Sequence, residues 1–347
     1  MSRTYLDWNA TTPLRCEARD AMVAAMELVG NPSSVHAEGR AAKGLIERAR
    51  KDIAAALGAE GADVIFTSSA TEAAALLLAG RDVHCAGIEH DAVRSWCVED
   101  LKISADGAVV VDDPKASTLQ LANSETGIIQ DLPDGVFLTD ATQGFGKIPF
   151  AFNWSGAAAA IVSAHKLGGP KGIGALVVKR GTEIEARIKG GGQEMGRRSG
   201  TENVIGIAGF AAAAVAAQRD LEAGVWTRVS KLRKILENTI AESVNNTIFV
   251  GIDANRLPNT SCFITPGWKG ETQVMVMDLA GFAVSAGSAC SSGKVKSSAA
   301  LAAMGFDRDQ AGCALRVSLG PSTSEDEVRA FADAWLREYE KFRARGG

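Results

Sequence analysis

Short apolar runs alternate along the chain with longer segments in which apolar residues recur every three or four positions. The apolar runs predict strands at 63–68, 82–87, 107–111, 118–123, 135–140, 159–164 and 174–179. The periodic, alanine-rich segments predict helices at 16–29, 39–58 and 71–80. Strands that are apolar throughout and alternate with helices predict an α/β domain, built on a mostly parallel sheet that helices flank.

The pattern changes near residue 203. A long helical pattern continues through 219–244, and short strand-like runs follow at 259–266, 282–288 and 315–320. A final amphipathic helix is predicted from about Glu325. Because 347 residues exceed one average core, we expect two domains. The larger would cover 13–222, and a smaller α+β domain would combine 1–12 with 223–347.

Composition narrows the classes of partner and compartment. The 37 basic and 41 acidic residues give a formal net charge of −4, with both signs spread along the chain, so no nucleic-acid partner is expected. The stretch 204–218 is too short and too weakly apolar to predict a membrane span. Residues 1–13 lack the apolar core of a signal peptide. We therefore expect a cytoplasmic protein without a membrane partner.

Six cysteines are present, and no two of them form a C-x-x-C pair: Cys16, Cys85, Cys97, Cys262, Cys290 and Cys313. The spacing predicts no metal centre, and a disulfide framework is not expected in a long chain without a secretory signal. Most of the thiols would be buried as small apolar side chains. Cys290 differs because the small and polar residues around it, SAGSACSSGK, predict an exposed loop.

Polar side chains stand at the predicted carboxyl ends of three strands, where open α/β sheets bind ligands. Ser69 and Glu72 fit a capping box that leaves a helix N-terminus open to an anion. Asp140 and Lys166 each follow another strand. Each feature alone also fits simple capping or a lysine that reaches solvent. Together they predict pyridoxal phosphate, which needs a lysine for a Schiff base, a carboxylate for its pyridine nitrogen and a site for its phosphate.

Ten segments in order resemble the cysteine desulfurases of the NifS/IscS type, in the class V aminotransferase family. They are YLDWNATTP, GNPSSVHAEGR, FTSSATEA, EHDAV, ANSETG, DATQGFGKIP, SAHKLGGPKGIGAL, RRSGTEN, SAGSACSSG and LRVSLG. The resemblance implies the pyridoxal-phosphate-dependent transferase fold of type I and a homodimer. It also implies conversion of L-cysteine to L-alanine, with the sulfur carried on Cys290 as a persulfide for an acceptor such as an iron–sulfur scaffold protein.

The resemblance assigns roles around the cofactor ring. Lys166 would form the Schiff base, and Asp140 would hold the pyridine nitrogen. Gln143 would lie near the phenolic oxygen of the ring. His90 would stack on the ring face and move protons, which makes it catalytic together with Lys166 and Cys290.

The resemblance also assigns the residues that would bind the cofactor phosphate and the substrate carboxylate. The cofactor phosphate would be lined by Ala70, Thr71, Ser163 and His165, and by Thr201 from the partner subunit. Arg316 would clamp the substrate carboxylate through its planar fork of donors, with help from Asn31. No metal ligand is expected.

One position departs from the family pattern, which usually has two asparagines before the glutamate of ANSETG. Here Asn123 is followed by Ser124, so a hydroxyl replaces an amide beside the cofactor or substrate.

Two alternatives stay open. A selenocysteine lyase or aminotransferase of the same class would keep Lys166 and Asp140, and Cys290 argues against the aminotransferase. A noncatalytic sulfur carrier or regulatory relative would have no need of the complete set of site residues.

Overall fold

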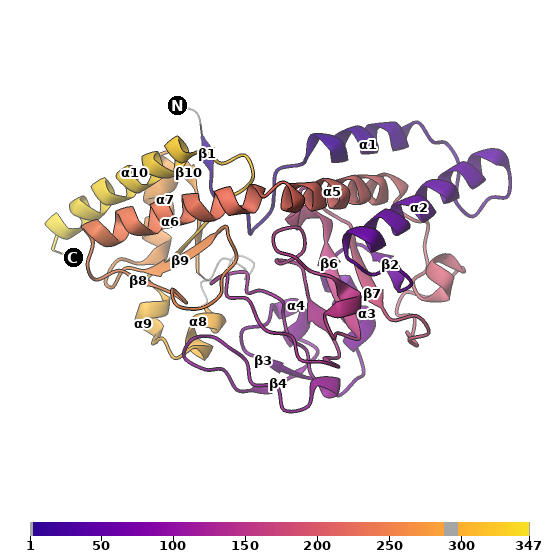
Figure 1. Ribbon diagram of the computed structural model, residues 1–347, viewed down its shortest axis with the longest axis horizontal. Helices are drawn as coiled ribbons and strands as arrows, with labels where there is room; N and C mark the ends of the chain where they lie inside the picture. The colour runs from indigo at the N-terminus through magenta and orange to yellow at the C-terminus, as the bar shows by residue number, and fades with distance from the viewer. Residues whose placement is uncertain (1–2, 288–297, 347) are drawn as a thin grey trace.

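The computed structural model describes residues 3–287 and 298–346. Its larger half, on the right in Figure 1, contains a sheet in the order β2-β7-β6-β5. These strands are β2 (Asp63–Thr67), β5 (Thr139–Asp140), β6 (Ala159–Ser163) and β7 (Gly174–Val178). Strands β5 and β6 are parallel, whereas β7 runs antiparallel to both β6 and β2. The carboxyl ends of β2, β5 and β6 therefore lie at one edge.

Backbone hydrogen bonds extend this sheet. Residues 117–121 bond to β5 and to the residue before it, with Leu119 N–H donating to Leu138 at 3.0 Å and Leu121 N–H donating to Asp140 at 2.9 Å. Thr118 N–H donates to His84 at 2.8 Å and so joins β3 (His84–Ala86), which pairs in parallel with β4 (Val98–Leu101). The prediction of a mostly parallel sheet is confirmed, with β7 as an antiparallel member. The predicted strand at 107–111 is wrong, because Val109 makes only an isolated bridge to Ile103 there.

Helices cover both faces of the sheet. Val64 and Phe66 of β2 pack in the core with α1 (Cys16–Met26), α2 (Ala37–Ala56) and α5 (Val204–Glu222), whereas Ile65 packs in the core with α3 (Ala70–Leu78). This alternation follows from the two-residue period of a strand. Helix α2 forms because its buried residues recur at helical spacing: Ala42, Ile46, Ala49, Ile53 and Ala56.

The long helical pattern after residue 203 forms two helices and not one. Gly224 adopts a left-handed φ of 70°, which a glycine reaches without strain, and α6 (Val225–Ser243) begins directly after it. Helices α5 and α6 cross the middle of Figure 1 in sequence and carry the chain into its left-hand half.

An antiparallel sheet of order β11-β12-β9-β8 forms the smaller half. Its strands are β8 (Ile248–Phe249), β9 (Thr260–Ile264), β11 (Ser285–Ala286) and β12 (Ala314–Ser318). Its helices are α6, α7 (Gly270–Leu279), α8 (Ala299–Ala303), α9 (Arg308–Ala311) and α10 (Glu325–Ala344). The N-terminal β1 (Thr4–Tyr5) pairs in parallel with β10 (Phe282–Ala283), and Leu6 is buried in the same core as Trp335. The α+β character of this half is confirmed.

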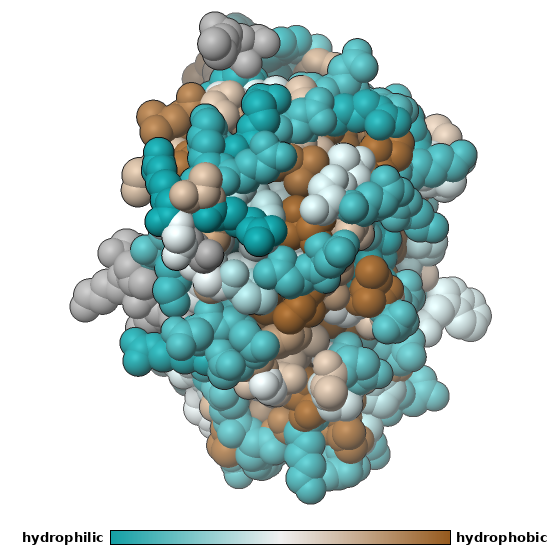
Figure 2. All heavy atoms as spheres, turned by 90° about the vertical axis from the view of Figure 1, so that its left-hand side faces the viewer, coloured by the Kyte–Doolittle hydropathy of each residue, from teal (hydrophilic) through white to brown (hydrophobic). Residues whose placement is uncertain are grey.

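Shorter helices connect the larger elements: α4 (Asp91–Arg94) and the 3-10 helices Pro114–Ala116, Phe152–Trp154, Ala164–Lys166 and Gln193–Gly196. Helix α5 has the length and composition of a membrane span, but most of its apolar side chains lie in the protein core. The face of the smaller half in Figure 2 is largely hydrophilic, with hydrophobic residues in separate patches between polar side chains.

Candidate active site

Lys166 lies just beyond the carboxyl end of β6, in the 3-10 helix Ala164–Lys166. Its Nζ donates to the carbonyl oxygens of Asn9 at 2.6 Å and Ala10 at 2.9 Å. Thr12 fixes the same N-terminal segment, since both its N–H and its hydroxyl donate to the carbonyl oxygen of His165. The position of the lysine at a strand end agrees with the sequence, whereas its contact with the N-terminal segment was not predicted.

Asp140 ends β5, directly beside β6. Its Oδ1 accepts a hydrogen bond from the N–H of Thr142 at 2.9 Å. The Thr142 hydroxyl is buried and has no partner among the described residues. A carboxylate and an unsatisfied hydroxyl therefore stand at the sheet edge that also carries Lys166, which suits a polar ligand there.

The N-terminus of α3 lies against this edge. Ser69 caps the helix by accepting from the N–H of Glu72 at 3.2 Å, but Glu72 bonds to the N–H of Ser68 and to Arg198, so only half of the predicted capping box forms. Gly174 of β7 permits this approach, because a Cβ there would lie 2.7 Å from the carbonyl carbon of Ser69. Ser163 pairs with Gly174 in the sheet. Ser163 and the α3 N-terminus, with Ala70 and Thr71 in its first turn, are thus brought close together.

His90 is the N-cap of α4, where its Nδ1 accepts from the N–H of Ala92 at 3.1 Å, and the residue is exposed. Its neighbour Glu89 is buried and accepts from the N–H of Gln120 at 2.6 Å. Burial, and then the charge of Asp140, raise the pKa of Glu89 well above its usual value. The charged form of Glu89 is therefore disfavoured at this edge. Glu89 was not predicted from the sequence.

His165 directly precedes Lys166 in the chain, and its Nδ1 is 3.1 Å from the hydroxyl oxygen of Thr11. Burial, followed by the nearby lysine charges, lowers the pKa of His165 to about 4. The imidazole is therefore neutral at pH 7.

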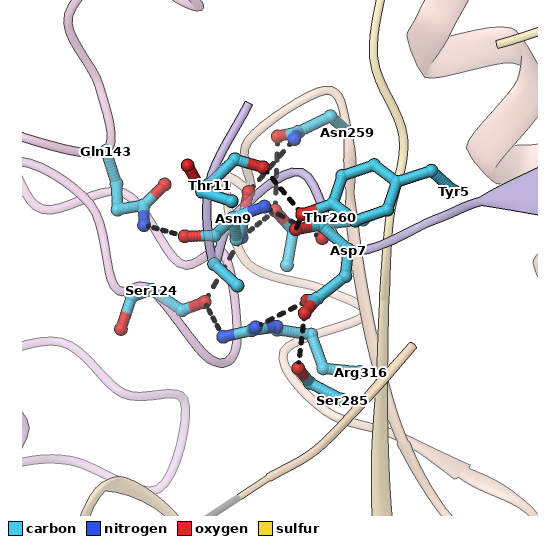
Figure 3. Close-up of polar contacts among 12 residues, drawn as sticks. Tyr5, Asp7, Asn9, Thr11, Ser124, Gln143, Asn259, Thr260, Ser285 and Arg316 are labelled. Carbon is cyan, nitrogen blue, oxygen red and sulfur yellow. Dashed lines mark hydrogen bonds and ion pairs between the residues drawn. The ribbon is translucent and has the colours of Figure 1, made fainter. Parts of the chain in front are cut away.

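Arg316 is buried in β12 with 1% of its surface exposed. Its Nη2 donates to Oδ1 of Asp7 at 2.8 Å, and its Nη1 donates to the carbonyl oxygen of Ser124 at 3.1 Å (Figure 3). Ser285 donates to the other oxygen of Asp7 at 2.8 Å. The buried guanidinium is thus paired with a carboxylate and a carbonyl oxygen of its own chain. The contact of Ser124 is made by its backbone, not by the hydroxyl that distinguishes this chain.

Asn9 links the two halves of the site and was missed in the sequence, although it lies within YLDWNATTP. Its carbonyl oxygen accepts from both Lys166 and Gln143, the latter at 2.9 Å. Its side-chain amide donates to Ser124 at 3.1 Å and to the hydroxyl of Thr260 at 2.8 Å (Figure 3). Asn9 thus accepts from Lys166 through its carbonyl oxygen, and its side chain shares the carbonyl oxygen of Ser124 with Arg316.

The structure does not bring Asn31 or Thr201 to this cluster within one subunit. Asn31 is exposed in the connection between α1 and α2, which Figure 1 draws at the end away from the smaller half. Thr201 is exposed and lines a cavity of about 190 Å³ with Phe66 and Ser68 at the carboxyl end of β2, and neither Lys166 nor Asp140 lines that cavity. Cys290 lies outside the described residues. Among the described residues, no group of three or more His, Cys, Asp or Glu side chains could hold a metal ion.

A strand-end lysine and aspartate, a facing helix N-terminus and a paired arginine are features of a class of enzymes that act on amino acids through pyridoxal phosphate. The chain belongs to the family described as Aminotransferase class-V, whose model matches residues 4–96 and 98–331.

Individual relatives are similar over nearly their whole length. Cysteine desulfurase IscS of Dictyoglomus turgidum is 35% identical over 98% of this chain and 95% of that protein. An IscS-like cysteine desulfurase of Mycobacterium tuberculosis is 36% identical over 94% of this chain and 93% of its own. The solved structure of a NifS-like protein from Rickettsia africae superposes with a TM-score of 0.88 at 30% identity, covering 97% of this chain and 99% of that one. The predicted fold type I architecture is confirmed.

Proposed function

We propose that this chain is a pyridoxal-phosphate-dependent cysteine desulfurase, which converts L-cysteine to L-alanine and transfers the sulfur to Cys290. The observation that carries the proposal is the placement of Lys166 and Asp140 at the ends of the neighbouring strands β6 and β5. The family and the relatives named cysteine desulfurase support the same activity.

The residues present fit the cofactor. Lys166 would bind it covalently and Asp140 would hold its pyridine nitrogen, while the buried hydroxyl of Thr142 is a further polar group at this edge. The phosphate would lie between the α3 N-terminus, with Ala70 and Thr71, and the end of β6, with Ser163 and His165. When bound, pyridoxal phosphate supplies an electron-poor ring that withdraws electrons from the amino acid attached to it.

Side chains of the protein would then carry out the remaining steps. Arg316 orients the substrate by its carboxylate, whereas Asn31 lies away from this cluster within one subunit. His90, exposed at the start of α4, and Lys166 move protons. The Cys290 thiolate attacks the substrate sulfur and forms a sulfur–sulfur bond. The carbon–sulfur bond breaks, its electron pair stays with carbon, and a proton delivered to that carbon completes alanine.

The site requires a second subunit in this proposal. Thr201 is exposed and shares its cavity with neither Lys166 nor Asp140 of its own chain, which suits a residue that completes the phosphate site of a partner in a homodimer. Sulfur on Cys290 would pass to an acceptor such as an iron–sulfur scaffold protein. We place the enzyme in the cytoplasm, with residues 13–222 as the large domain and 1–12 with 223–347 as the small one.

The decisive experiment is incubation of the cofactor-loaded protein with L-cysteine and a reductant, with sulfide and alanine measured together. Equal amounts of both support the desulfurase. A keto acid without sulfide would indicate an aminotransferase, and turnover of selenocysteine alone would indicate a selenocysteine lyase. No product from a cofactor-loaded protein would indicate the noncatalytic relative.

A further inference from the structure

We propose that Lys147 is a positioning residue that fixes the amide of Gln143, so that its NH₂ group and not its oxygen is presented to the phenolic oxygen of the cofactor. The inference deepens the proposed function and rests on it. Lys147 itself would touch neither substrate nor cofactor.

Lys147 is almost completely buried, with 2% of its surface exposed. Its Nζ lies 2.6 Å from Oε1 of Gln143 and 3.1 Å from Oδ1 of Asn9. No ion pair joins Lys147 to a carboxylate in 3–287 or 298–346, the ranges that the structure describes. A buried amine without an opposite charge costs stability, so packing alone does not account for a lysine at this position.

The hydrogen-bond chemistry determines how the two amides point. An ammonium group only donates, and a neutral amine still has two N–H groups for the two oxygens that face it. The oxygen of Gln143 must therefore face Lys147, which turns its Nε2 toward the carbonyl oxygen of Asn9 at 2.9 Å. An amide nitrogen carries two hydrogens, so one remains for another acceptor. Without Lys147, only the contact with the Asn9 carbonyl oxygen would oppose a half-turn of the amide that exchanges its oxygen and nitrogen.

The contact of Lys147 with Oδ1 of Asn9 fixes the orientation of the Asn9 amide in the same way. Its Oδ1 accepts from Lys147 and, at 3.0 Å, from Asn259, so its Nδ2 is directed to Ser124 and Thr260. Burial lowers the pKa of Lys147 well below its usual value, and the charges of Lys166 and Arg316 add to this effect. The two donors that a neutral amine retains are sufficient for both oxygens.

The test compares Lys147→Met with Lys179→Met, a matched change of an exposed lysine beyond the end of β7. Both proteins are loaded with pyridoxal phosphate, and the absorbance of the bound cofactor is titrated with pH. In Lys147→Met the phenolic oxygen loses an oriented donor, so the titration midpoint should rise by about one pH unit, the equivalent of one hydrogen bond. Lys179→Met should titrate like the wild type. For L-cysteine, kcat should fall more than KM changes in Lys147→Met.

A double variant tests whether Lys147 acts through Gln143. In a Gln143→Ala background, Lys147→Met should cause no further shift. A folded Lys147→Met protein with the wild-type midpoint would overturn the inference, and so would a shift of full size in the Gln143→Ala background. If Lys147→Met does not fold, Lys147→Leu replaces it. Leucine donates no hydrogen bond to either oxygen, so a raised midpoint is again expected and an unchanged one contradicts the inference. A wild type that binds no cofactor would instead refute the proposed function.

Discussion

The guanidinium of Arg316 donates to Oδ1 of Asp7 at 2.8 Å, and Asp7 stands two residues before the carbonyl oxygen that accepts from Lys166. One short N-terminal segment thus contacts both the lysine expected to carry the cofactor and the arginine expected to bind the substrate carboxylate. Because Arg316 is buried, the orientation of its planar fork depends on this segment.

Asp7→Asn should weaken substrate binding without loss of the cofactor. The amide keeps the shape of the carboxylate but loses its charge, so the fork of Arg316 is held less firmly. We expect KM for L-cysteine to rise about tenfold, the equivalent of one charge-assisted hydrogen bond, with the absorbance of the bound cofactor unchanged. Asp278→Asn, which changes an exposed carboxylate on α7, is the control. Equal KM values for the two variants would contradict this role of Asp7.

Ser124→Asn should be tolerated. The described contacts of Ser124 with Asn9 and Arg316 use its carbonyl oxygen, which every residue provides. Asparagine is also the residue that the resemblance to the cysteine desulfurases implies at this position. We expect kcat/KM for L-cysteine to stay within about threefold of the wild type, because no polar contact is removed. Loss of cofactor from a folded Ser124→Asn protein would show that the serine side chain itself is required.

The sequence predicts the groups that follow strands, because strand ends are visible in the apolar pattern and parallel strands bring their carboxyl ends to one edge. Lys166 and Asp140 were found in this way, and the structure places both at that edge. Arg316 was identified through the family resemblance, and a charge that is buried in an apolar strand needs a partner. The identity of that partner, Asp7, could not be predicted, since 309 positions separate them and periodicity carries no information on such contacts.

Lys147 and Glu89 show a second feature that could not be predicted from the sequence, which is the burial of an ionisable side chain. Both lie within segments that carry the family resemblance, but their burial depends on how loops close over the sheet edge. Residues 107–111 show the converse, because their β-branched side chains predict a strand that finds no neighbour to pair with beyond one bridge.

His165→Gln should make the protein less sensitive to acid. The pKa of His165 is about 4 in the folded protein and 6.5 when unperturbed. As the pH falls below 6.5 the unfolded chain binds a proton that the folded protein does not, so stability is lost progressively down to about pH 4. The neutral glutamine cannot contribute to this loss. The decrease in melting temperature between pH 7.5 and pH 5 should therefore be smaller in the variant, as measured by thermal denaturation.

His84→Gln is the control for His165. His84 is partly exposed, and its bond to Asp100 raises its pKa, so its contribution is present at low pH and lost as the pH rises. Its removal should not improve acid stability. An equal effect of the two variants would mean that burial of His165 is not the cause.

Cys290→Ser distinguishes the desulfurase from the alternative functions. This prediction rests on the sequence, because Cys290 lies outside the described residues. If this thiol accepts the sulfur, the variant should fold, bind pyridoxal phosphate at Lys166 and bind L-cysteine, but its sulfide release should fall on the order of a hundredfold or more. Wild-type protein exposed briefly to L-cysteine without reductant should carry an extra sulfur on the peptide that contains Cys290, detected by mass spectrometry. Cys16→Ser, at the exposed cysteine of α1, should retain full activity. Substantial sulfide release by Cys290→Ser, or a persulfide found only on another cysteine, would refute the assignment of Cys290 as the sulfur acceptor.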